Sequence, residues 1–177
     1  RDIGGAVDVL ASDSPAYPSM PDGWSIKRRI AEIYVDSNGH IKEFLSWGND
    51  VYWVTPVLDV NTADFSGPSL FELTVPPGFR VKAHITGMAM RTSGSAQPVL
   101  YVYPPEADSS TGWAICRWIL DTYSYWVVGQ STVLTDASGR VGVRVHEGPA
   151  DVRVHTLGYE SPRGRTMRVA SGTELSF

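Results

Sequence analysis

The sequence FELTVPPGFRVKAHIT, residues 71–86, alternates apolar and polar side chains on both sides of a Pro-Pro-Gly turn. Successive side chains of a β-strand point to opposite faces, so this alternation is typical of two strands that each have one buried and one wet face. Because Pro76, Pro77 and Gly78 favour a turn, we expect the two strands to pair as a β-hairpin.

Short runs rich in β-branched and aromatic residues continue along the chain, separated by many of its 17 glycines and 12 prolines. Asp-Ser-Asn-Gly at 36–39 and Asp-Ala-Ser-Gly at 136–139 predict tight hairpin turns, since glycine tolerates positive φ angles. Pro56 interrupts the run at 51–60, so we expect an edge strand or a bulge there, followed by a loop at 62–68. No window shows a 3.6-residue apolar period over three turns. The sequence therefore predicts an all-β fold: an antiparallel β-sandwich, jelly-roll-like, with about ten short strands and no substantial helix.

The chain has 177 residues, of which 42% are hydrophobic and 19% are charged, as expected of one globular domain with its own core. We expect a single β-sandwich domain at residues 1–165. For the tail at 166–177, a solvated surface, a contact between subunits and a contact with lipopolysaccharide phosphate are the alternatives. The formal net charge is -4 and no basic stripe is visible, which argues against nucleic acid as a partner. No apolar run of about 18 residues exists, so we expect no membrane insertion.

Motifs that carry catalytic or metal chemistry are missing from the sequence. Its four histidines form neither an HxH nor an HExxH pattern, no GxSxG sequence surrounds a serine, and Cys116 is the only cysteine. We therefore expect no enzyme activity, no catalytic residue and no cofactor. A Ser–His pair or two carboxylates assembled from distant positions stay open as the enzyme alternative. We also expect no bound metal, with Asp59, Asn61 and Asp64 as candidate oxygen ligands for calcium if one is bound.

Aromatic residues cluster beside two predicted turns. Trp47 lies directly before the turn at 48–50, and Tyr123, Tyr125 and Trp126 surround another. Exposed aromatic rings anchor interfaces and stack on sugar rings, so these four residues are the candidate receptor- or glycan-binding residues. The alternative is that their rings fill the core and the ends of the sandwich.

Several short motifs occur in an order that resembles a known family. They are VDVLAS at 7–12, MPDGW at 20–24, KRRI at 27–30, DSNGHI at 36–41, TVPPG at 74–78, LGY at 157–159 and RGR at 163–165. In this pattern the chain resembles an uncharacterised β-sandwich domain of tailed-bacteriophage and prophage fibre and virion proteins. Ala31 stands where that pattern has Gly, Trp47 stands where it has Gln, and Asn49 is an extra residue in the turn before Asp50.

The resemblance implies a virion structural domain of a tail or head fibre, which presents or performs binding to a glycan or protein receptor on the host surface. It also implies a homotrimer in contact with other virion proteins, located in the virion and assembled in the host cytoplasm. In such relatives another strand precedes position 7, so we expect that residue 1 is not the true start of the protein. Two alternatives stay open: a carbohydrate-binding β-sandwich module of a larger enzyme, and a domain that decorates or caps a capsid. The family supplies no catalytic residue.

Overall fold

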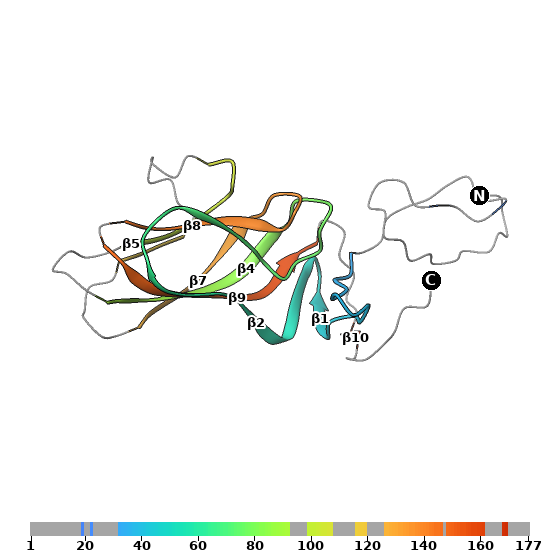
Figure 1. Ribbon diagram of the computed structural model, residues 1–177. Helices are drawn as coiled ribbons and strands as arrows, with labels where there is room; N and C mark the ends of the chain where they lie inside the picture. Colours follow the sequence, from blue (N-terminus) through green and yellow to red (C-terminus); the bar gives the residue numbers. More distant parts are fainter. Residues whose placement is uncertain are drawn as a thin grey trace.

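A computed structural model of the chain describes residues 19, 22, 32–92, 99–107, 126–146, 148–161 and, for their backbone alone, 116–119 and 168–169. Within these residues the chain forms β-strands and no α-helix, arranged as two antiparallel sheets (Figure 1). No helix in this part of the chain is long and apolar enough to cross a membrane. The prediction of an all-β, antiparallel β-sandwich without a substantial helix is therefore confirmed for the described residues.

The larger sheet has the strand order β10-β1-β2-β9-β4-β7, and the smaller sheet has the order β3-β8-β5-β6. The strands of the larger sheet are β1 (Phe44–Trp47), β2 (Asp50–Phe65), β4 (Lys82–Arg91), β7 (Val127–Leu134), β9 (Ala150–Glu160) and β10 (Arg168–Val169). Those of the smaller sheet are β3 (Ser69–Glu72), β5 (Val99–Tyr103), β6 (Cys116–Ile119) and β8 (Arg140–His146). The strands described by their backbone alone, β10 and β6, each lie at the edge of a sheet.

The number and length of the strands differ from the expectation of about ten short ones. Eight strands have described side chains, five in the larger sheet and three in the smaller, and β2 (16 residues), β9 (11) and β4 (10) are long. The predicted loop at 62–68 is wrong, because β2 continues to Phe65, which pairs with Ala150 of β9. The bulge that Pro56 led us to expect is confirmed, since the β2–β9 register shifts between Tyr52 and Val57.

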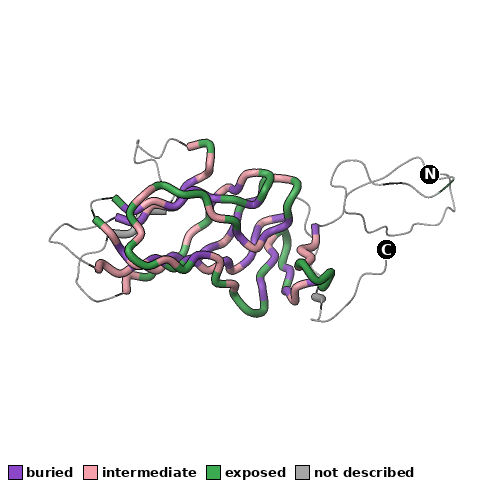
Figure 2. The backbone as a smooth tube through the Cα atoms, in the orientation of Figure 1, coloured by how far each residue is buried: buried purple, intermediate pink, exposed green. Residues whose placement is uncertain are grey.

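The core lies between the two sheets and is rich in valine, whose β-branched side chain packs well on a pleated surface. Val141, Val143 and Val145 of β8 contribute to it from the smaller sheet, and Val152 and Val154 of β9 contribute from the larger one. Figure 2 shows the buried residues spaced along the strands of both sheets, with exposed residues at the connecting turns. The same alternation places polar side chains of these strands on the outer faces.

The segment 71–86 does not form the expected hairpin. β3 pairs with β8 in the smaller sheet, whereas β4 pairs with β7 and β9 in the larger sheet. Leu73 and Val75 belong to the core, and the Val75 N–H donates to the Leu73 carbonyl at 2.8 Å in a tight turn between the sheets. Pro76 and Pro77 carry no N–H, so they cannot continue a strand ladder. The alternating pattern is therefore real, but the chain crosses from one sheet to the other at the proline pair.

The two Asp-x-x-Gly turns share one set of hydrogen bonds. In each, an Asp carboxylate oxygen accepts hydrogen bonds from the backbone N–H groups two and four residues later, at 2.8 to 3.0 Å. Gly39 and Gly139 adopt φ angles of 81° and 75°, which glycine reaches without steric cost. Tight turns at 36–39 and 136–139 are thus confirmed. The second turn joins β7 to β8, however, and because these strands belong to different sheets it does not close a hairpin ladder.

Candidate functional site

The outer face of the larger sheet carries a compact set of residues at the end where β1 and β2 form a hairpin. The antiparallel registers place these residues in two rows that run across β1, β2, β9 and β4. Buried residues alternate with them along β1 and the start of β2, so their side chains point away from the core. We call this set the outer-face array: its first row is Trp47, Asp50, Glu160 and Lys82, and its second row is Leu45, Tyr52, Gly158 and His84.

One ion pair and one hydrogen bond to a histidine ring organise the polar groups of the array. Lys82 Nζ lies 2.9 Å from Glu160 Oε2, and His84 Nε2 lies 3.0 Å from Asp50 Oδ1. Each pair occupies one oxygen of its carboxylate, and the second oxygen receives no hydrogen bond from the described residues. The Glu160 and Asp50 side chains are partly exposed, so both second oxygens are available as acceptors to an external ligand.

Gly158 lies beneath two stacked aromatic rings of the array. It is the paired residue of both Tyr52 on β2 and His84 on β4. The rings of Tyr52 and His84 are stacked, with centroids 5.2 Å apart and planes inclined by 18°. Rings from two strands that are not neighbours therefore meet across β9, at the glycine with which both residues pair. A Cβ atom at Gly158 would lie only 1.9 Å from the Val51 carbonyl oxygen, so the close approach of β9 to β2 requires glycine here.

Large apolar side chains are exposed around these polar groups. Trp47 is 79% exposed, and Leu45, Tyr52 and Val54 of the same hairpin are each more than 40% exposed. A single exposed apolar residue is normal on a protein surface, whereas a cluster that includes an exposed tryptophan is typical of a binding site. The array therefore combines an aromatic and aliphatic surface with fixed hydrogen-bonding groups.

The structure describes two of the four predicted aromatic binding residues, and it does not bring these two together. Trp47 belongs to the array, at the end of β9 where Glu160 lies. Trp126 directly precedes β7, and the Arg153 guanidinium carbon lies 4.6 Å from the centroid of its ring. Arg153 is near the start of β9, away from the array. The other two predicted residues, Tyr123 and Tyr125, lie outside the described residues.

The three candidate calcium ligands bond to different partners and do not converge. Asp59 accepts hydrogen bonds from the Thr74 N–H at 2.8 Å, from the Thr74 hydroxyl at 2.7 Å and from the Thr156 hydroxyl. The Asn61 side chain accepts a hydrogen bond from Arg153 Nε of β9. The Asp64 N–H donates to the Asp151 carboxylate of β9. In the part of the chain that the structure describes, no three His, Cys, Asp or Glu side chains gather as metal ligands.

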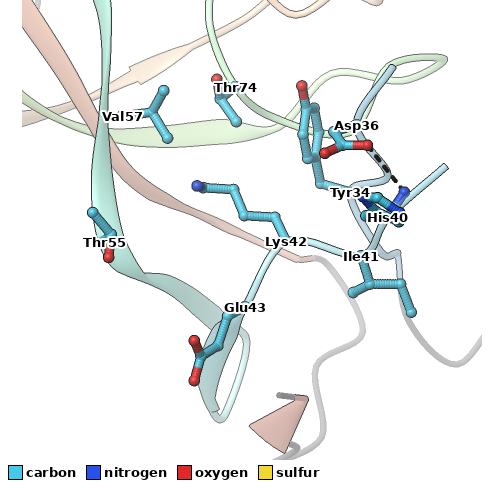
Figure 3. A pocket seen from close by; sticks show the side chains of 9 residues that line it. All are labelled: Tyr34, Asp36, His40, Ile41, Lys42, Glu43, Thr55, Val57 and Thr74. Carbon is cyan, nitrogen blue, oxygen red and sulfur yellow. Dashed lines mark hydrogen bonds between the residues drawn. The ribbon is translucent and has the colours of Figure 1, made fainter. Parts of the chain in front are cut away.

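A recess of about 430 Å³ lies between the segment 34–43 and the middle of β2 (Figure 3). The residues that line it are Tyr34, Asp36, His40, Ile41, Lys42, Glu43, Thr55, Val57 and Thr74. The Lys42 side chain points toward β2, and its Nζ lies 5.8 Å from the centroid of the Trp53 ring. Burial raises the pKa of the Tyr34 phenol above its usual value of 10.0, and the Asp59 carboxylate raises this pKa further.

Several polar groups of the recess already hold the fold together. The Asp36 carboxylate accepts the backbone hydrogen bonds of its own turn, and Thr74 bonds to Asp59. The Trp53 indole N–H donates to the Thr74 carbonyl at 3.1 Å, which fixes the ring over which Lys42 lies.

The segment 34–43 is anchored to β2 by the Lys42–Trp53 contact and by the edge-on contact of the Tyr34 and Trp53 rings. A hydrogen bond from the Val54 N–H to the Glu43 carbonyl also anchors it. We therefore assign the recess a structural role and regard the outer-face array as the candidate functional site.

Comparisons of the chain with protein-family models and with curated proteins found no match. The array is therefore defined by the geometry of this chain alone. Among its members, reasoning from the sequence singled out only Trp47 as a binding residue. Lys82 and His84 fall on the polar face of an alternating strand, and this exposure was the signal that the sequence offered for them. Alternation does not reveal which strand lies alongside, so it could not reveal the array.

Proposed function

We propose that this chain is a structural domain of a bacteriophage virion, in a tail or head fibre, that presents or performs binding to a receptor on the host surface. The observation that carries the proposal is the outer-face array, where Trp47 is exposed beside apolar neighbours and ion-paired polar groups. Aromatic anchors next to a few placed polar groups are typical of recognition surfaces. The motif resemblance supplies the virion context, and the proposed role is binding without catalysis.

The proposal includes a jelly-roll-like arrangement of the strands β2 to β9. The order β2-β9-β4-β7 in one sheet and β3-β8-β5-β6 in the other supports it, because each sheet joins strands from the first and second halves of this series. Nested Greek keys produce such an order. Jelly rolls occur in viral capsid domains and in lectins, so this analogy of fold agrees with a virion domain that binds a receptor.

Self-association into a homotrimer, in contact with other virion proteins, is also part of the proposal. Linking three copies of a weak site raises the apparent affinity for a surface that displays many receptors. Within the predicted tail at 166–177, residues 168–169 pair with β1 of the same chain, and the rest of the tail lies outside the described residues. An assembly of this kind belongs to the virion and forms in the host cytoplasm.

The solution mass of the purified protein, measured by light scattering at several concentrations, tests this proposal together with its binding to a panel of bacterial strains. We expect a stable trimer that binds some strains. A protein that is monomeric at every concentration and binds no strain contradicts the proposal.

A carbohydrate-binding β-sandwich module of a larger enzyme is the second candidate function. It is favoured by the exposed Trp47 and by the stacked rings of Tyr52 and His84, since sugar-binding surfaces present aromatic rings. A monomer that binds soluble glycans without attaching to cells would support this candidate over the virion domain.

A further inference from the structure

We propose that the outer-face array binds a neutral glycan built of pyranose rings, with Trp47 as the stacking residue and Asp50 and Glu160 as hydrogen-bond acceptors. This inference rests on the proposed function, because it names the class of receptor that the same surface recognises. It is argued from the size of the array, from its aromatic surface and from its charges.

The width of the array matches a short glycan. The array spans two rows of four positions across β1, β2, β9 and β4. Neighbouring strands are about 4.8 Å apart, so a row extends about 14 Å from β1 to β4. This is the scale of a short oligosaccharide lying across the strands.

The aromatic surface suits the apolar face of a sugar ring. Trp47 is 79% exposed and stands at the β1 end of the first row, so its ring is open to a ligand. The π face of an aromatic ring is electronegative and attracts the weakly positive C–H groups of a pyranose. Leu45 and the Tyr52–His84 stack continue the surface in the second row. A sugar that stacks on Trp47 lies beside Asp50, the paired residue of Trp47, so the hydroxyl groups on the sugar's edge can reach the first row.

The first row supplies the polar contacts for that edge. Asp50 and Glu160 each have one oxygen that no described residue uses, and their other oxygens contact His84 Nε2 and Lys82 Nζ. Sugar hydroxyl groups can donate to these oxygens, and the Lys82 ammonium can donate to a ring or hydroxyl oxygen. Because the groups lie on paired strands, the backbone that carries them is already ordered before the ligand binds.

The charges of the first row select against an acidic group placed directly on that row. Two carboxylates there face one ammonium, and His84 adds a positive charge only when it is protonated, whereas Arg168 of β10 pairs with Leu45 at the far end of the second row. A uronic or sialic acid would place another carboxylate beside Asp50 and Glu160, and like charges at close range are repelled. Neutral hexoses and N-acetylhexosamines carry hydroxyl donors without that charge, and they are the ligands that the row accommodates.

The test measures binding of the purified full chain to a panel of immobilised glycans. Calorimetric titration follows with the neutral and acidic oligosaccharides that give the strongest signals. We expect neutral glycans to bind and their acidic counterparts to bind more weakly. Trp47→Ala should weaken binding by about tenfold or more, as for a central aromatic anchor. Leu70→Ala is the matched control, because Leu70 is 49% exposed on β3 of the other sheet and should leave binding unchanged.

Thermal unfolding of each variant separates a loss of binding from a loss of fold, and neither exposed side chain should change the Tm much. Absence of neutral-glycan binding, or equal effects of Trp47→Ala and Leu70→Ala, overturns the inference. Binding to cells before and after periodate oxidation of their surface sugars separates the two proposals. Cell binding that survives oxidation and Trp47→Ala overturns this inference but leaves the proposed function, whereas glycan binding without any cell binding overturns only the proposed function.

Discussion

At position 158 the backbone of β9 passes so close to β2 that a side chain has no room. A Cβ atom would lie 1.9 Å from the Val51 carbonyl oxygen and 2.9 Å from Tyr52 Cα, and both obstacles are backbone atoms that cannot move without shifting a strand. Tyr52 and His84, whose rings are stacked, both pair with this residue. The close backbone contact at Gly158 therefore lies within the candidate site.

Gly158→Ala should lower the free energy of unfolding by about 3 kcal/mol or more, because the clash must be relieved by moving β9 or β2. Urea denaturation followed by tryptophan fluorescence measures this change. Gly67→Ala is the matched control: a Cβ at Gly67 meets no atom within 4 Å, so its effect should stay within about 0.5 kcal/mol. Equal effects of the two substitutions would contradict the close approach of β9 to β2 at Gly158.

Asp136 is a second residue whose role follows from its immediate contacts. Partial burial acts to raise the pKa of its carboxyl, but hydrogen bonds from the N–H and guanidinium of Arg140 and from the Ser138 N–H outweigh burial and lower the pKa below its usual value of 3.8. Because the folded-state pKa lies below the unfolded one, the carboxylate contributes stability that is fully present above the unfolded pKa. That stability is lost as pH falls through the folded pKa.

Asp136→Asn should therefore be less stable than the wild type near neutral pH, and the difference should shrink as pH falls below about 4. Asparagine keeps the size of the side chain and one acceptor oxygen, so the substitution removes mainly the charge. Urea denaturation of both proteins between about pH 7 and about pH 3 measures the difference. A gap that stays constant over this range would mean that ionisation of Asp136 does not stabilise the turn.

At the scale of elements, the bulges of β2 matter as much as its length. The β2–β9 register shifts between Leu58 and Val60, which places Asp59 where it accepts hydrogen bonds from Thr156 of β9 and from Thr74 in the crossover after β3. Thr156 is completely buried, so its hydroxyl has no access to water. A carboxylate that the sequence offered as a candidate calcium ligand thus joins the larger sheet to the chain that leads out of the smaller one.

Asp59→Ala should lower the free energy of unfolding by about 2–3 kcal/mol, because it leaves the Thr156 hydroxyl and the Thr74 N–H without their acceptor. Asn61→Ala, two residues along the same strand, is the control: its side chain accepts one long hydrogen bond on the surface, at 3.3 Å, and should contribute less than about 0.5 kcal/mol. Urea midpoints and m-values of the two variants provide the comparison. Similar losses would argue against a special role for the bulge.

At the scale of the whole molecule, the connections between strands determine which surfaces exist. The rows of the outer-face array join β1, β2, β9 and β4, so they combine residues from the first third of the sequence with residues near 160. A hairpin of β3 with β4, as the alternation at 71–86 suggested, would have taken one of the two edges of β4, which β7 and β9 occupy in the structure. The crossover at Pro76 and Pro77 leaves both edges to these strands, and the array uses the edge that β9 occupies.

Local chemistry was sufficient for what the sequence by itself determined: the all-β class, the tight turns at 36–39 and 136–139, the bulge near Pro56 and the alternating exposure of Lys82 and His84. These features depend on the φ angles that Gly and Pro allow and on the two-residue period of a strand, and both are properties of neighbouring residues. The choice of partner strand is not a property of neighbouring residues, because an alternating strand presents the same apolar face to any partner. Only the tertiary structure decided that β4 lies beside β9, that Gly158 lies between Tyr52 and His84, and that Trp47 and Trp126 lie apart, since each depends on contacts between residues distant in the chain.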